Sequence, residues 1–72
     1  MGKDHKDLVV LLTQKRKEAG ITQASLAEAV QVSRKSINAI ENGIYIPSTV
    51  LALKIARTLN CKVEDIFELP IK

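Results

Sequence analysis

The segment from Ser33 to Asn42 carries side chains of the types that hydrogen bond to nucleic-acid bases. If it is helical, its outward face presents two cations and several small polar or methyl groups, namely Arg34, Lys35, Ser36, Asn38 and Ala39. Arg and Lys donate to guanine O6 and N7, Asn pairs with adenine, and an Ala methyl contacts the thymine methyl. A helix N-terminus also attracts phosphate. The segment is therefore a candidate for reading bases in the major groove of DNA, although a solvated surface pair is the default interpretation of two isolated cations.

Caps and apolar spacing predict that this segment is the second helix of a closely packed pair. Thr22 is an N-cap candidate for a first helix over Gln23–Val30, and Ser33 is one for a second helix over Arg34–Asn42. Gly43 can adopt the positive φ that ends the second helix. The apolar residues expected to fill the space between the helices are Leu26, Ala27, Val30, Ile37 and Ile40. Two short helices joined by a three-residue turn form a helix-turn-helix, and the alanine permits their close crossing.

Three further helices are expected around this pair. Apolar residues at helical spacing before Gly20 predict a helix over about residues 5–18. Ser48 caps a regular apolar stripe that runs to Asn60. A short fifth helix begins near Val63 and includes Phe67, and a tail follows it. The sequence thus predicts an all-α, compact five-helix fold in one domain over residues 1–72, with the helix-turn-helix at about 22–42.

Composition limits the other functions that this chain could have. The chain has 72 residues, a net charge of +3 and a single cysteine, Cys61, so it can form no internal disulfide and, with one distant histidine, His5, no zinc site. Catalytic triads, glycine-rich phosphate loops and paired metal ligands are missing from the sequence. We expect no catalysis, metal, cofactor or small-molecule ligand, and we assign His5 no role. No apolar run approaches the length of a membrane span, so a cytoplasmic location is expected.

The stretch ITQASLAEAVQVSRKSINAIENG, followed by P-S and LALKIA, resembles the lambda-repressor-like, XRE-type helix-turn-helix family of small DNA-binding transcriptional regulators. The resemblance covers residues 8–69. It implies that Gln23 holds a phosphate, that Arg34 with Lys35 reads bases, and that Asn42 touches the DNA backbone. It also implies an internal ion pair between Arg16 and Glu41, whereas two exposed charges would contribute little to stability.

Ser33 and two departures from the family pattern affect these expectations. Ser33 is either only a helix cap or a cap that also contacts phosphate. Gln31 stands where many members carry Gly, so a left-handed turn there costs about 1 kcal/mol or more. The loop of Ile44, Tyr45 and Ile46 lacks the Lys or Arg common in the family, which leaves backbone amides as its expected phosphate donors.

The resemblance implies sequence-specific binding to double-stranded DNA, with repression as the favoured mode of regulation. A homodimer on a palindromic operator is expected because two recognition helices one turn apart read such a site. Surplus apolar residues place the dimer contact in a tail at about residues 63–72, with Val50 or Leu53 adjoining; the contact residues are Val63, Ile66, Leu69 and Ile71. Alternatively, Ile66 and Phe67 close the monomer core while Leu69 and Ile71 fray. A further alternative is that dimerisation occurs only on DNA. A protein-interaction module, such as an antitoxin or adaptor, is the rival function, because fold does not fix function.

Overall fold

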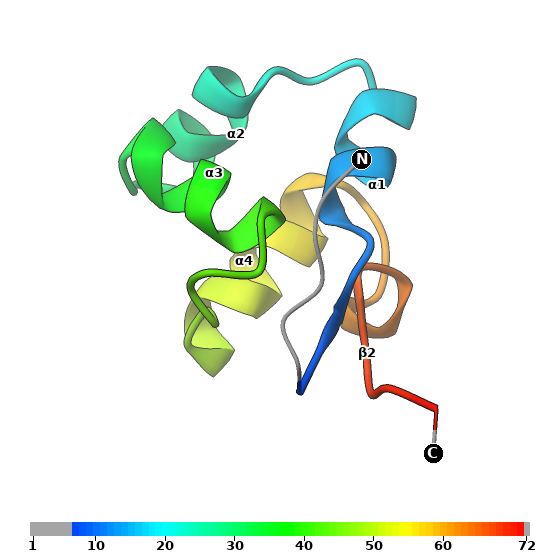
Figure 1. The fold of residues 1–72 in the computed structure, drawn as a ribbon. Coiled ribbons are helices and arrows are strands. Elements are labelled where there is room, and N and C mark those ends of the chain that lie inside the picture. The colour runs from blue at the N-terminus through cyan, green and yellow to red at the C-terminus, as the bar shows by residue number, and fades with distance from the viewer. Residues whose placement is uncertain (1–6, 72) are drawn as a thin grey trace.

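The computed structural model describes residues 7–71, which form four α-helices, a short 3-10 helix and a two-stranded sheet (Figure 1). In chain order the elements are β1 Val9–Val10, α1 Leu12–Glu18, α2 Gln23–Val30, α3 Arg34–Glu41, α4 Thr49–Thr58, η1 Val63–Asp65 and β2 Phe67–Glu68. None of these helices is long and apolar enough to span a membrane. The five-helix, all-α prediction is therefore wrong at both ends of the fold, whereas the three central helices lie where they were expected.

The first error concerns the start of the predicted helix over residues 5–18, of which residues 5 and 6 lie outside the described part. Helix α1 begins only at Leu12, and β1 pairs antiparallel with β2, with Val10 opposite Phe67. The Leu11 amide continues this link by donating to the Ile66 carbonyl at 2.8 Å. Two adjacent β-branched valines favour extended backbone. The strand then depends on a partner from the other end of the chain, which local spacing cannot reveal.

The second error concerns the predicted fifth helix. Only a 3-10 helix forms, and it is closed by the Lys62 amide donating to Asp65 Oδ2 at 2.9 Å. The chain then straightens into β2, and both Ile66 and Phe67 are buried. Pairing with β1 satisfies the backbone hydrogen-bonding groups of this segment, so its apolar residues reach the core without a further helical turn.

The predicted N-caps are confirmed, and all four α-helices end in the same way. In each cap a hydroxyl oxygen accepts a backbone N–H three residues later. The pairs are Thr22 with Ser25 (3.0 Å), Ser33 with Ser36 (3.1 Å) and Ser48 with Leu51 (3.1 Å). Each helix is followed by a residue with positive φ, namely Gly20 (72°), Gln31 (64°), Gly43 (71°) or Asn60 (55°). Gln31 therefore adopts the left-handed turn that was expected to cost about 1 kcal/mol or more.

The core packs α2 against both α3 and α4, and the sheet and η1 close its far side. All five residues predicted to lie between the helices of the pair are buried, including Ala27 at 3% exposure. Figure 1 shows α2 and α3 together on one side of the molecule, away from the sheet. This packing fixes the angle between α2 and α3, and it leaves the polar face of α3 directed away from the core.

Candidate nucleic-acid interface

The base of the interface is a buried ion pair between α1 and α3. Arg16 Nε donates to Glu41 Oε2 at 2.6 Å, and Arg16 Nη2 donates to Oε1 at 3.3 Å. The remaining terminal nitrogen of Arg16 donates to the Ile21 carbonyl at 2.8 Å. Arg16 is only 8% exposed and Glu41 only 3%. The structure thus brings together the two residues that the family resemblance pairs, in a buried arrangement rather than as two exposed charges.

The surroundings of Glu41 keep its carboxylate charged. Burial alone would raise the pKa of Glu41, but hydrogen bonds from Arg16 and Gln23, together with the attraction of the Arg16 charge, outweigh burial and lower it. The Thr13 hydroxyl also favours the charged form, although its geometry falls short of a regular hydrogen bond. The carboxylate is therefore a permanent acceptor at neutral pH.

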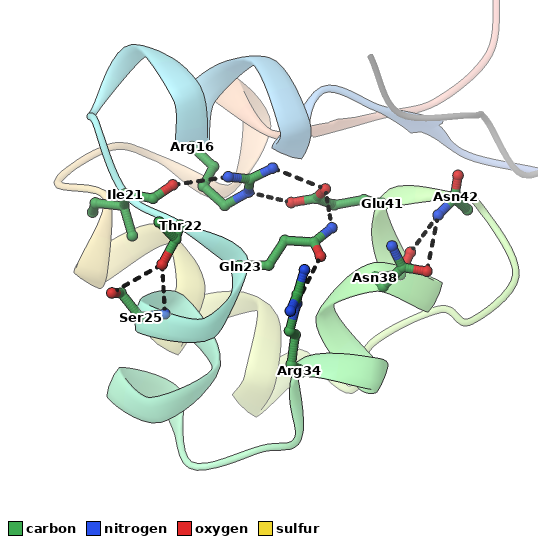
Figure 2. Close-up of polar contacts among 9 residues, drawn as sticks. All are labelled: Arg16, Ile21, Thr22, Gln23, Ser25, Arg34, Asn38, Glu41 and Asn42. Atoms are coloured by element: carbon green, nitrogen blue, oxygen red, sulfur yellow. Dashed lines mark hydrogen bonds and ion pairs between the residues drawn. The ribbon is translucent and has the colours of Figure 1, made fainter.

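Gln23, at the start of α2, connects this ion pair to the outer surface of α3 (Figure 2). Its Nε2 donates to Glu41 Oε1 at 2.9 Å, while its Oε1 accepts a long hydrogen bond from Arg34 Nε at 3.4 Å. A continuous chain of contacts consequently runs from the buried Arg16 to the exposed Arg34. The family resemblance implied a phosphate contact for Gln23, and nothing in the sequence indicated this internal role, because only the tertiary fold brings the three helices together.

The predicted base-contacting residues occupy the outer face of α3. Arg34, Lys35 and Asn38 are exposed, while Ser36 and Ala39 are half-buried. Lys35 makes no hydrogen bond or ion pair with any residue from 7 to 71. Two cations and an amide therefore face solvent together within the first five residues of α3.

The caps at the two ends of α3 are both engaged within the helix. Ser33 Oγ accepts the Ser36 amide hydrogen and lies 3.0 Å from Ser36 Oγ. At the opposite end, Asn42 Nδ2 donates to the Asn38 carbonyl at 2.8 Å and to Asn38 Oδ1 at 3.2 Å (Figure 2). Asn42 lies at the opposite end of α3 from Ser33. A contact from its Nδ2 to the DNA backbone would compete with the two bonds to Asn38.

The loop after α3 offers fewer phosphate donors than its sequence suggested. The amides of Ile44 and Tyr45 donate to the Ala39 carbonyl at 2.9 and 3.3 Å, and the Gly43 amide donates to the Ile40 carbonyl at 3.1 Å. These bonds satisfy carbonyls at the end of α3. The amides of Ile44 and Tyr45 are thus already used within the chain, so the expected donation of loop backbone amides to phosphate would fall mainly to Ile46.

The residues predicted for a dimer contact are divided between the core and the surface. Ile66 is fully buried, so it belongs to the monomer core and is not available to a partner. Val63 is half-buried beside that core. Leu69 and Ile71 are 81% and 100% exposed. Only the last two could contribute most of their surface to an interface.

The remaining chemically reactive group is the thiol of Cys61, which is half-buried. Burial raises its pKa, the negative charge of Asp65 raises it further, and Lys15 opposes this shift only in part. The thiol is therefore a weak nucleophile at neutral pH. Among residues 7–71, no group of three or more His, Cys, Asp or Glu side chains could hold a metal ion; His5 lies outside the described residues.

Comparisons with known proteins agree with this geometry. The sequence profile of the helix-turn-helix family matches residues 12–66. A helix-turn-helix transcriptional regulator of Methanothermobacter thermautotrophicus is 52% identical over 58 residues, which cover 79% of this chain and 84% of the relative. The crystal structure of the clp gene regulator ClgR from Corynebacterium glutamicum is similar with a TM-score of 0.74 and 31% identity, over 76% of this chain and 58% of that protein.

A second solved structure extends the similarity to nearly the whole chain. The transcriptional regulator VanUg matches with a TM-score of 0.67 and 27% identity, over 93% of this chain and 92% of that protein. The profile match, the close relative and both structures thus agree on one assignment. The chain belongs to the helix-turn-helix family of DNA-binding transcriptional regulators.

Proposed function

We propose that this protein binds double-stranded DNA sequence-specifically by inserting the N-terminal half of α3 into the major groove. The observation that carries the proposal is the state of Arg34. Its Nε is held by Gln23, whereas its two terminal nitrogens have no partner among residues 7–71. Those nitrogens form the fork that donates to guanine O6 and N7. The long contact with Gln23 favours one orientation of the Arg34 side chain, which reduces the conformational entropy lost when Arg34 contacts a base.

Gln23 can contact phosphate without giving up its internal role. A side-chain amide nitrogen has two N–H donors, and Gln23 uses one of them on Glu41. The second donor is left for a DNA phosphate. In this arrangement the buried carboxylate positions Gln23, and Gln23 in turn positions Arg34, so the phosphate contact and the base contact share one support. Lys35 and Asn38 complete the reading surface, with Ser36 and Ala39 beside them.

We further propose that the protein acts as a repressor, in the cytoplasm, as a homodimer on a palindromic operator. Repression is inferred from the resemblance to lambda-repressor-like regulators. The dimer is inferred because one short helix contacts only a few base pairs, whereas two helices related by a twofold axis read an operator of useful length. The continuous core from β1 to β2 supports a single domain. The relatives are transcriptional regulators, which supports a function without catalysis.

Selection of bound sequences from a random DNA pool tests the proposal, and we expect enriched half-sites with twofold symmetry. In titrations at fixed salt on the selected site, Arg34→Ala or Lys35→Ala should each lose about 1 to 3 kcal/mol per lost base contact. Lys62→Ala removes an exposed cation from the far end of the chain and is the charge-matched control. Thermal melts of the three variants should coincide.

Two results would contradict the proposal. Unchanged affinity in both α3 variants would exclude the assigned base contacts. A failure to enrich any sequence from the pool would favour the rival function, an antitoxin or adaptor that uses the same fold to bind protein.

A further inference from the structure

An apolar groove lies on the side of α4 that faces the small sheet. It has a volume of about 620 Å³ and is lined mainly by apolar side chains from the α3–α4 loop, α4, η1 and both ends of the sheet, among them Leu8, Ile46, Pro47, Leu53, Val63 and Phe67. Ile46 and Leu53 remain about half exposed at its edge, and Glu64 is among its lining residues. A concave surface lined by apolar side chains can receive an apolar segment.

The segment after β2 has the complementary property. Its apolar side chains Leu69 and Ile71 are almost entirely exposed, and they stand two residues apart, so in extended backbone they point to the same side. Figure 1 shows this segment, in red, leaving β2 in the direction away from α4. Neither Leu69 nor Ile71 is among the residues that line the groove, so the segment does not cover the groove of its own chain.

We propose that the groove receives the segment from a second copy of the chain, so that Leu69 and Ile71 of each copy enter the groove of the other. This proposal rests on the homodimer of the proposed function and specifies its contact. Lys72 follows Ile71 in the sequence, and Glu64 is among the residues that line the groove, so the receiving site offers an acidic residue to the lysine of the segment.

A twofold axis makes the exchange reciprocal, because each copy then both donates a segment and receives one. Stable interfaces bury roughly 800 Å² on each partner, which is more than one short segment provides. Two exchanged segments, together with the exposed Val50 and Leu53 on α4, extend the contact over one continuous surface. The outer face of α3 takes no part in it and stays available to DNA.

Disulfide trapping tests the exchange directly. In a Cys61→Ser background, Leu53→Cys is placed in one copy and Ile71→Cys in another copy that carries a tag of different mass. After mixing and mild oxidation, we expect the mixed disulfide between the two copies to form several-fold more than with a control pair, in which Ile71→Cys is mixed with Glu28→Cys on the exposed face of α2. A chain that carries both Leu53→Cys and Ile71→Cys reports whether the segment fills its own groove instead.

A truncation after Glu68 provides the second measurement. Sedimentation of the truncated protein, alone and on a duplex with two half-sites, should show dimerisation at least about tenfold weaker than that of the full chain. The truncated protein should still show a cooperative thermal unfolding transition. Undiminished dimerisation would overturn the exchange, as would a disulfide formed only within one chain.

The same experiments separate this proposal from the proposed function. A protein that dimerises without the mixed disulfide would refute the exchange alone. A protein that stays monomeric both free and on DNA would refute the homodimer and the exchange together. Binding of the truncated monomer to a single half-site tests base recognition by α3 independently of both.

Discussion

The buried pair of Arg16 and Glu41 permits a quantitative test of the structure through the single variants Arg16→Met and Glu41→Leu. Arg16→Met leaves a buried carboxylate whose only remaining regular hydrogen bond from residues 7–71 comes from Gln23. Glu41→Leu leaves a buried guanidinium whose only remaining partner in the described part of the chain is the Ile21 carbonyl. Breaking a buried ion pair from one side costs roughly 3–5 kcal/mol. We therefore expect each single variant to lose a large part of a total stability of about 5–15 kcal/mol.

The double variant should lose less stability than the sum of the losses in the two single variants. Replacing a buried pair with apolar residues of similar size is often neutral or stabilising, so Arg16→Met with Glu41→Leu should recover most of the loss. In a domain of this size each 1 kcal/mol shifts Tm by about 4–8 °C, so a loss of roughly 3 kcal/mol lowers Tm by roughly 12–24 °C. Thermal melts at neutral pH, monitored by circular dichroism, give the Tm of all four proteins of this double-mutant cycle.

Lys15→Met is the matched control, because Lys15 and Glu18 form an exposed pair at 3.7 Å and such pairs contribute about 0–1 kcal/mol. Single variants of Arg16 and Glu41 that melt within a few degrees of the parent would refute the reasoning, as would a double variant that loses the full sum. The recovered double variant should still bind DNA more weakly than the parent, since Gln23 has then lost the carboxylate that positions it.

Three further predictions concern stability. Ala27→Leu should cost about 1–3 kcal/mol by overpacking the contact of α2 with the core; an unchanged Tm would mean that the crossing is not tight. The lowered pKa of Glu41 means that its contribution is present at neutral pH and lost as the pH falls below the ordinary value of 4.5. Tm measured against pH should consequently fall less steeply in acid for Glu41→Gln than for the parent, and parallel curves would contradict this. Gln31→Gly should raise stability by up to about 1 kcal/mol in urea titrations, because it relieves a left-handed residue. The control Gln14→Gly in α1 should lower stability by about 1 kcal/mol, so equal losses in the two glycine variants would exclude strain at Gln31.

The central helices could be predicted from the sequence because the forces that define them are local. A hydroxyl at Thr22, Ser33 or Ser48 caps the backbone three residues later, and helical hydrogen bonds join residues four apart. The spacing of Leu26, Ile37 and the other apolar residues of the helix pair likewise determines which face is buried. These signals lie within short windows of the chain, so they identified the helix-turn-helix and its outer polar face.

The tertiary structure alone decided the features that need partners far apart in the chain. Val9 and Val10 form a strand only because Phe67 and Glu68 supply its hydrogen bonds, and the helical spacing of the neighbouring leucines concealed it. Gln23 reaches a carboxylate on α3 only after α1, α2 and α3 have packed together. A strand pairing or a shared buried hydrogen bond is a property of two segments at once. Its free energy depends on burial and geometry that neither segment possesses before the core closes.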